Sequence, residues 1–407
     1  MRHNFDHGAL TTAAGPDRFV ARGRQTHNRS RQEPSVSPSA RATGLILLGA
    51  LAASAPARAT SERTFVASYG ADSNPCSVAA PCRTFAAALG LTAAGGEVVA
   101  LDSAGYGSVT ITQSVSISAP AGVYAGVTPP TNGSGGVLIN APGATVVLRG
   151  LEFGPTAAGA YVTHLGTGIE VLAAQSVTVE RCSFIGNLSY GISTLDPPAA
   201  QATGLTMSIS NSNFVGVSRG INLNAYSYLA GASVTASIHN VSMNGSGIVN
   251  PSTAGDVGIL AGDGVTASVD GSRIIGYGAA ISLGSGIARS VPGQVSVNVT
   301  AINNVLTGGW QGVAAVNLTA NVVAVTLRGN VISGATSAGA VNQPSGSSAG
   351  VYVSGNVEAS LDANSITGNT VGVYNGGGNA VIQSYGSNQL EGNATDVVGT
   401  LTPAVTQ

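Results

Sequence analysis

Three polar residues are the best candidates for acid–base chemistry in this sequence: His239, Asp270 and Arg273. His239 and Asp270 hold equivalent positions in two similar segments, so a repeating fold would place their side chains next to each other. A histidine beside a carboxylate can act as a general acid or base, and Arg273 follows closely in the chain. One interpretation is therefore an acid–base site on a sugar-binding surface.

Other charges at the same position of the repeat favour a structural role for this pair. Adjacent repeats would place Arg149 beside Glu180 and Arg328 beside Asp362. Opposite charges one strand apart form surface ion pairs, each contributing only about 0–1 kcal/mol. A ladder of surface ion pairs is the preferred prediction, and catalysis is the alternative. His164 lies in a loop without an obvious partner.

Three aromatic residues, Tyr190, Tyr277 and Trp310, follow the ends of similar segments. If the segments stack, these side chains would project from the same turn of different coils. Aromatic rings present flat apolar surfaces that suit the apolar faces of sugar rings. The sequence therefore leaves two interpretations open: isolated loop residues, which are slightly favoured, and a glycan-binding platform formed by these three side chains.

The three cysteines divide into a pair and a single residue. Cys76 and Cys82 lie close together in the segment NPCSVAAPC, where an exported protein would form a local disulfide. Cys182 falls at a packed turn position without a histidine nearby, which indicates an inert buried thiol.

No metal site is predicted. Asp256, Asp263 and Asp270 recur at a spacing of seven, but a hard cation needs several oxygens that converge on one point. Asp263 is interpreted as a turn residue. Nothing in the sequence indicates a cofactor.

A repeat of about 30 residues supplies the framework for these side chains. Each repeat has an alternating Val/Ile segment, a polar step, an apolar residue and then a glycine. SVTVERCSFIG and TMSISNSNFVG are examples. The closing glycines are Gly154, Gly186, Gly216, Gly245, Gly276, Gly308, Gly334, Gly368 and Gly392. A second signal, such as Gly191-Ile192 or Gly220-Ile221, follows a few residues later.

Positions counted back from each closing glycine form apolar columns. Two residues before it stand Phe184, Phe214, Met243, Ile274, Leu306, Ile332, Ile366 and Leu390. The positions seven and eleven before it share one side of a strand and are mostly apolar, ending with Tyr385 and Val381 in the last repeat. No single coil can bury these side chains, whereas stacked coils can.

An asparagine column marks the bend of the later repeats, four residues before the closing glycine. It comprises Asn304, Asn330, Asn364 and Asn388, where the earlier repeats have Cys182, Ser212, Val241 and Ser272. Stacked asparagines can form hydrogen bonds from amide to amide, while the neighbouring residue takes a left-handed conformation. This pattern is typical of an asparagine ladder in a β-solenoid.

The predicted fold is an all-β, single-stranded right-handed parallel β-helix with about nine or more coils and a short capping helix over Arg83 to Thr92. The predicted organisation is a leader over 1–59, a cap with the disulfide over 60–97, the β-helix over 98–399 and a tail over 400–407. Only 8% of the residues are charged, and 57 are glycine, as expected of a β-rich chain with tight turns.

The charge argues against two classes of partner. From Thr60 onward, eight arginines and no lysine stand against fifteen acidic residues, which gives a net charge of −7. Nucleic acids and anionic membranes need clustered cations, so neither is expected to bind the body of the chain.

The leader has the layout of a secretory signal. The apolar run at 44–55, GLILLGALAASA, follows Arg41 and precedes the small residues around Arg58. It is shorter than the roughly 20 residues of a membrane span. We predict cleavage after Ala59 and export to the periplasm, cell surface or medium, with no membrane span in the mature chain.

Several segments resemble a known group of proteins. TFVASYGADSNPC, PCRTFAAAL and GGEVVALDSAGYGSVTITQSVSIS, with SYGSNQLEGNATD near the end, are similar to bacterial secreted right-handed parallel β-helix proteins of the pectate-lyase-like superfamily. The resemblance covers about Thr64 to Gly399 and implies the fold and export. Pectate lyases of this fold use clustered Asp for calcium, and polygalacturonases use three Asp, a His and Arg-Ile-Lys. This sequence has no Asp-Asp pair, no Gly-His-Gly and no lysine, which speaks against both mechanisms.

The favoured function is an exported, non-catalytic binding or structural module, with a polysaccharide or cell-surface glycan as the partner. A polysaccharide lyase, glycoside hydrolase or epimerase with a divergent site is the first alternative, and a protein-binding adhesin is the second. Fold and function are separate inferences, because one solenoid can serve all three roles.

Overall fold

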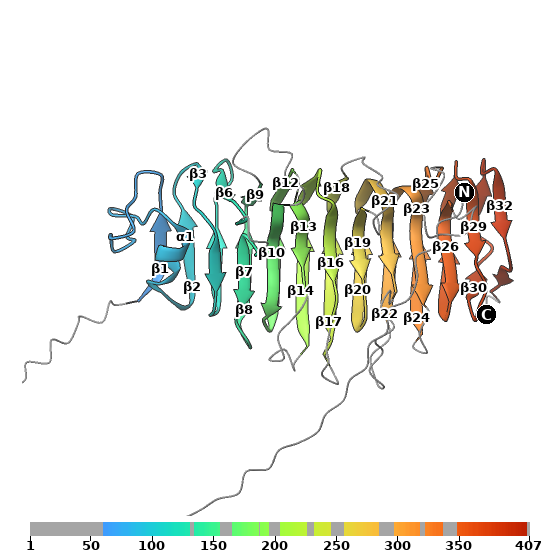
Figure 1. Ribbon diagram of the computed structural model, residues 1–407, viewed down its shortest axis with the longest axis horizontal. Helices are drawn as coiled ribbons and strands as arrows, with labels where there is room; N and C mark the ends of the chain where they lie inside the picture. The colour runs from blue at the N-terminus through green and yellow to red at the C-terminus, as the bar shows by residue number, and fades with distance from the viewer. Residues whose placement is uncertain are drawn as a thin grey trace, which may run out of the picture. The chain divides into compact units, whose positions relative to one another are not determined.

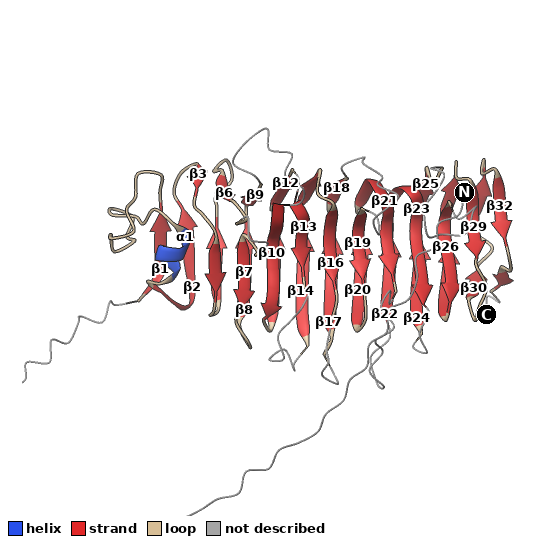
Figure 2. Ribbon diagram, in the orientation of Figure 1, coloured by secondary structure: helices blue, strands red, loops and turns tan. Residues whose placement is uncertain are grey.

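The computed structural model describes residues 60–130, 134–154, 165–186, 188–194, 204–225, 232–245, 256–284, 297–317, 322–336 and 348–404. All of them belong to one compact unit, Ala57–Gln407. In these ranges the chain is almost entirely strand, with a single short helix (Figure 2). The leader, its cleavage site and His164 lie outside the described residues.

Most coils contribute three strands, and the strands pair with their counterparts in the next coil. β11 (Ser176–Glu180), β12 (Ser183–Ile185) and β13 (Leu188–Ser193) form one coil. They pair in parallel with β14 (Leu205–Ser210), β15 (Asn213–Val215) and β16 (Arg219–Leu223), respectively. The chain is therefore a right-handed parallel β-helix, as predicted, and its strands follow one another in chain order (Figure 1).

The first face is a parallel sheet of thirteen strands among the described residues. Besides β11 and β14 it contains β1 (Ser61–Val66), β2 (Thr92–Ala100), β5 (Val115–Ser118), β8 (Thr145–Arg149), β17 (Val234–His239), β20 (Val265–Asp270), β22 (Val297–Ile302), β24 (Val323–Arg328), β27 (Val357–Asp362), β30 (Val381–Ser384) and β33 (Thr402–Pro403).

The second face is made of short strands. Besides β12 and β15 it contains β3 (Ala104–Gly105), β6 (Ala125–Val127), β9 (Leu151–Phe153), β18 (Ser242–Asn244), β25 (Val331–Ser333), β28 (Ser365–Thr367) and β31 (Gln389–Glu391). The third face contains β13, β16, β4 (Val109–Ile111), β7 (Val137–Asn140), β10 (Leu165–Ala173), β19 (Val257–Ala261), β26 (Ala349–Gly355), β29 (Val371–Asn375) and β32 (Thr395–Val398). Two long strands, β21 (Arg273–Leu283) and β23 (Val305–Asn317), continue from the second face into the third.

The strand alternation buries one side of the first face, as predicted. In β17, for example, Ala236 and Ile238 are buried while Ser237 and His239 are exposed. The last coil differs from the prediction. Val381 is 42% exposed, and Ile382 takes the buried place opposite Ala359 instead. The reason is one additional residue between β30 and Asn388, which shifts the count by one, so the predicted inward places of Val381 and Tyr385 are wrong.

The apolar column of the second face is a stack of rings in the early coils. Phe184 lies parallel to Phe153 and to Phe214, with ring centroids 4.8 Å and 4.5 Å apart. A methyl group on Gly191 would lie only 2.6 Å from the ring of Phe214. Glycine at this position of the coil therefore lets the third face approach the ring stack.

The asparagine ladder is confirmed. The side-chain amides of Asn304, Asn330 and Asn364 each donate to Oδ1 of the asparagine in the next coil at 3.0 Å. The residues before the column adopt left-handed conformations in the coils from Arg181 to Ala363. A second, shorter ladder, not predicted, joins Asn369 Nδ2 to Asn393 Oδ1 at 3.1 Å.

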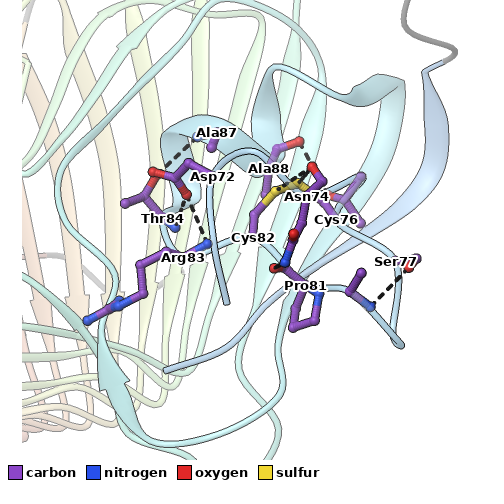
Figure 3. The surroundings of a disulfide bond; sticks show 12 residues. Asp72, Asn74, Cys76, Ser77, Pro81, Cys82, Arg83, Thr84, Ala87 and Ala88 are labelled. Atoms are coloured by element: carbon purple, nitrogen blue, oxygen red, sulfur yellow. Dashed lines mark hydrogen bonds between the residues drawn. A yellow bond between two sulfur atoms is a disulfide. The ribbon is translucent and has the colours of Figure 1, made fainter. Parts of the chain in front are cut away.

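The N-terminal end differs in detail from the prediction. The helix α1 covers only Phe85–Leu89, because Thr84 caps its first turn and β2 already begins at Thr92. β1 lies within the segment 60–97 expected to be a cap, β2 begins in that segment and ends beyond it, and β33 lies within the expected tail. The predicted disulfide between Cys76 and Cys82 is present, beside α1 (Figure 3). Within the described residues, no helix is long and apolar enough to cross a membrane.

Candidate functional site

The structure brings His239 and Asp270 together on the outer side of the first face. They are register partners on the neighbouring strands β17 and β20, and His239 Nδ1 lies 3.2 Å from Asp270 Oδ2. Both side chains are open to solvent, with 58% and 46% of their surfaces exposed. Their register neighbours in the next coils are Ser210 and Ile302, which supply no further acid or base.

The same column holds two further pairs, as predicted. Arg149 Nε lies 2.9 Å from a carboxylate oxygen of Glu180, and Arg328 Nε lies 3.3 Å from one of Asp362. In these pairs the arginine is exposed and the carboxylate partner is about one third exposed. The histidine pair is thus one of three similar pairs in the ion-pair ladder, which supports its structural interpretation.

Arg273 does not share this surface. The chain bends after Asp270 through Gly271, which has a φ of 57°, and through the buried Ser272. Arg273 then starts the second face, where its register neighbours are Ser242 and Val305. The three predicted acid–base residues therefore do not lie on one face of the coil.

The aromatic candidates lie where the second face turns into the third, in the strands β13, β21 and β23, and Tyr190 and Trp310 are partly exposed. Tyr190 and Arg219 are register partners on β13 and β16. The guanidinium carbon of Arg219 lies 5.4 Å from the centre of the Tyr190 ring, and its Nη1 donates to the Tyr190 hydroxyl at 2.8 Å. Arg219 is thereby held in place against an aromatic face.

Trp310 lies farther along the same turn, at the start of the third-face part of β23. Its side chain is half-buried. A methyl group on Gly278 of the neighbouring coil would lie 3.2 Å from the indole ring. Because Gly278 has no side chain, the indole can lie down against the backbone of that coil.

Tyr277 does not project into solvent, contrary to the prediction. Its side chain is fully buried, and its hydroxyl has no hydrogen-bond partner among the described residues. Burial raises the pKa of this phenol far above its usual value, with a smaller contribution from the charge of Asp256. Tyr277 therefore packs inside the turn and cannot serve as a glycan platform.

Two polar residues between Tyr190 and Trp310 were missed in the sequence. Ser218 Oγ donates to Asp256 Oδ1 at 2.6 Å, and the backbone carbonyl of Asp256 accepts the N–H of Gly278 at 2.9 Å. Asp256 precedes Val257, the register partner of Arg219. The regular spacing of Asp256, Asp263 and Asp270 does not reflect a shared site, because Asp256 accepts a hydrogen bond from Ser218 of the previous coil.

We call Tyr190, Ser218, Arg219, Asp256 and Trp310 the aromatic corner. These residues come from strands or turns of successive coils, from β13 to β23. With about 4.8 Å between coils, the corner extends about 19 Å along the stacking direction. It combines an indole face, a cation and a carboxylate on one accessible strip.

The remaining reactive groups fit structural roles. Cys182 is buried, and burial raises the pKa of its thiol to about 12, so it remains protonated and unreactive at neutral pH, as predicted. Asp263 lies in a turn, also as predicted. Among the described residues, no three His, Cys, Asp or Glu side chains lie close enough together to hold a metal ion.

No protein-family model matches this chain, and no curated protein matches its sequence. Solved structures with a similar path of the chain include a pectate lyase, with 14% identity over 83% of this chain and 80% of that chain and a TM-score of 0.38. They also include a rhamnogalacturonan lyase, with 11% identity over 83% and 84% and a TM-score of 0.41. The periplasmic alginate epimerase AlgG is 12% identical over 77% of each chain, with a TM-score of 0.36. The fold assignment itself rests on the strand pairings described above.

Proposed function

We propose that this right-handed parallel β-helix is an exported, non-catalytic binding module that holds a glycan at the aromatic corner. The observation that carries the proposal is the position of Trp310, which lies accessible on the glycine of one coil and in line with Asp256 of the coil before it. An aromatic face and hydrogen-bonding groups thus follow one another along the stacking direction.

The chemistry of the corner suits a sugar. A pyranose ring has an apolar face that packs against an indole, and it carries hydroxyls around its edge. The carboxylate of Asp256 can accept from such hydroxyls, and the guanidinium of Arg219 can donate to them. A polysaccharide has these features at regular intervals, so a chain laid along the corner would meet several coils.

The positions of the acid–base candidates favour binding over turnover. A general acid or base must come within hydrogen-bond reach of the reacting bond. His239 and Asp270 lie on the first face, whereas Tyr190, Arg219 and Trp310 lie at the turn between the other two faces. A sugar held at the corner would not reach the histidine pair.

Export is part of the proposal. The disulfide supports it, since structural disulfides persist in oxidising compartments. The apolar run at 44–55 and the cleavage predicted after Ala59 are consistent with it, and the proposed destination is the periplasm, the cell surface or the medium.

The test is a panel of soluble and insoluble polysaccharides, on which retention and product release are measured in parallel. Retention without product is expected. Trp310→Ala should weaken retention at least about tenfold, because one aromatic anchor dominates such a contact. Tyr69→Ala is the matched control, since Tyr69 is an exposed aromatic residue far from the corner, in the N-terminal loop.

Two outcomes would contradict the proposal. Product release that Asp270→Ala abolishes would establish the enzymatic alternative, a lyase, hydrolase or epimerase. Equal retention of the Trp310→Ala variant and the parent on every polysaccharide would remove the aromatic corner as the site. Binding to a protein in place of any glycan would favour the adhesin.

A further inference from the structure

The loop closed by the Cys76–Cys82 disulfide lies along the open edge of the first strand. β1 pairs with β2 on one side only. On its other side, the N–H of Phe65 donates to the carbonyl of Cys76 at 2.8 Å, and the carbonyl of Phe65 accepts the N–H of Cys82 at 2.9 Å. The N–H of Ala67 also donates to the carbonyl of Cys82 at 2.9 Å. The loop thus occupies the hydrogen-bonding groups that a further strand would use.

An uncovered edge of this kind is a liability. Unpaired N–H and C=O groups at the side of a sheet can pair with another extended chain, and proteins commonly cover such edges with a loop or helix. Every other described strand of the first face from β2 to β30 has a partner on both sides, so β1 is where the N-terminal end of this face needs a cover.

The two cysteines form backbone hydrogen bonds with the same residue of β1, one with its N–H and the other with its carbonyl. Cys76 binds the N–H of Phe65 and Cys82 binds its carbonyl, while the disulfide keeps their Cα atoms 4.6 Å apart. The cross-link therefore holds the two bonding groups together. It also limits the conformations that the loop can adopt when it is detached from β1.

The backbone of Cys76 adds a reason for the loop to depend on the disulfide. Cys76 has a φ of 56°, in the left-handed region that residues other than glycine rarely adopt. Without the bond to Cys82, the backbone at Cys76 can relax to a negative φ. That rotation would turn the Cys76 carbonyl away from the N–H of Phe65.

The base of the loop has separate anchors. One oxygen of Asp72 accepts the backbone N–H groups of Arg83 and Thr84, each at 2.9 Å (Figure 3). Asn74 Nδ2 donates to the carbonyl of Pro81 at 2.8 Å. Because these bonds do not involve the sulfur atoms, loss of the disulfide would loosen the contact with β1 before it released the whole loop.

We infer that the Cys76–Cys82 disulfide is a redox-sensitive fastener of this edge cover, closed in an oxidising compartment and opened by a dithiol reductant. In the opening step, a thiolate of the dithiol attacks one cysteine sulfur and the S–S bond breaks. One cysteine leaves as a thiolate, and the other forms a mixed disulfide with the reductant. The second thiolate of the same reductant then attacks the reductant's own sulfur in that mixed disulfide and releases the other cysteine as a thiolate. Two cysteine thiols form, and the reductant leaves as a cyclic disulfide, so two electrons and two protons pass to the protein.

Hydrogen–deuterium exchange on the full exported chain tests the inference. The backbone amides of Phe65 and Ala67 are compared in the oxidised protein, after dithiothreitol treatment, and in a Cys76→Ser/Cys82→Ser variant that needs no reductant access to the buried sulfurs. At least about tenfold faster exchange is expected in the last two samples. The amide of Ile238 in β17, in the middle of the first face, should exchange at an unchanged rate.

Ser77→Ala is the matched control, because Ser77 lies in the same loop and its change leaves the disulfide intact. Its amides at Phe65 and Ala67 should exchange as slowly as in the parent. Unchanged exchange at Phe65 in a sample whose mass shows two thiols more than the oxidised protein would overturn the inference. Equal acceleration at Phe65 and Ile238 would also overturn it, since the disulfide would then stabilise the whole β-helix rather than its edge cover.

Discussion

The Nδ2 group of Asn304 donates to Oδ1 of Asn330 at 3.0 Å, and the backbone N–H of Asn304 donates to the same oxygen, also at 3.0 Å. Asn330 in turn donates to the carbonyl of Ala301 and to Asn364 Oδ1. One buried amide thus satisfies groups of three coils. The bend between the first and second faces depends on this sharing, because the buried groups have no access to water.

Asn330→Ala should lower the free energy of unfolding by about 3 kcal/mol, since it leaves several buried donors and acceptors without partners. The measurement is the denaturant midpoint followed by far-UV circular dichroism. Asn298→Ala is the matched control, because Asn298 is exposed on the outer side of the first face. Its midpoint should stay within about 0.5 kcal/mol of the parent. Equal effects of the two changes would contradict the role of the ladder.

Tyr277→Phe should stabilise the protein by about 1 kcal/mol, because it removes a buried hydroxyl for which the described part of the chain supplies no partner. Tyr106→Phe provides the contrast. The buried Tyr106 hydroxyl donates to the backbone carbonyl of Asp102 at 2.5 Å and to Oδ1 of Asp102 at 2.6 Å. Its removal should destabilise by about 1 kcal/mol. A loss of stability in Tyr277→Phe would show that this hydroxyl has a partner in solution.

Asp102 makes the N-terminal end sensitive to acid. The side chain of Ser68 and then that of Tyr106 donate to this carboxylate and hold its pKa below the usual value, although burial acts in the opposite direction. The unfolded chain therefore binds the proton more readily than the folded one. The stabilisation is complete above the pKa of the unfolded state and is lost as the pH falls through the lower pKa of the folded state.

Exchange of the amides in β1 and β2 should accordingly accelerate below about pH 4, after correction for the intrinsic rate. Asp102→Asn should remove this acid-dependent component, because an amide does not titrate. Tyr106→Phe should reduce it, since one of the two donating side chains is lost. The same acid dependence in Asp102→Asn as in the parent would assign the effect to other carboxylates.

The pair of His239 and Asp270 should contribute little to stability. Both side chains are about half exposed, so solvent screens their attraction. A double-mutant cycle with His239→Ala and Asp270→Ala should give a coupling energy below about 1 kcal/mol, measured from unfolding midpoints at neutral pH and low salt. A coupling of several kcal/mol would contradict the view of this pair as one rung of a surface ladder.

Much of the β-helix could be predicted because parallel pairing in register turns a position in the repeat into a place on the coil. Alignment of the closing glycines of neighbouring repeats predicts that Phe184 stacks on Phe214 and Asn304 on Asn330. It also predicts that His239 lies beside Asp270. Each of these expectations is confirmed, since each concerns residues in strands or tight bends whose length is constant between coils.

Where the coils differ in length or direction, only the tertiary structure showed the positions of the side chains. One extra residue in the last coil turned Val381 outward. The bend at Gly271 placed Arg273 on another face than Asp270, and the bend at Gly276 within β21 brought Tyr277 into the interior. The hydrogen bond between Ser218 and Asp256 joins coils whose connections differ in length, so no fixed spacing in the sequence predicts it.

The sequence by itself thus determined the repeat, the apolar columns and the ladders, because strand periodicity and stacking leave each of those side chains a single direction. The composition of the aromatic corner and the cover over β1 depended on the tertiary structure. The direction of a side chain at a turn depends on the local backbone angles and on the space between neighbouring coils. Neither can be predicted from the spacing of residues in the sequence.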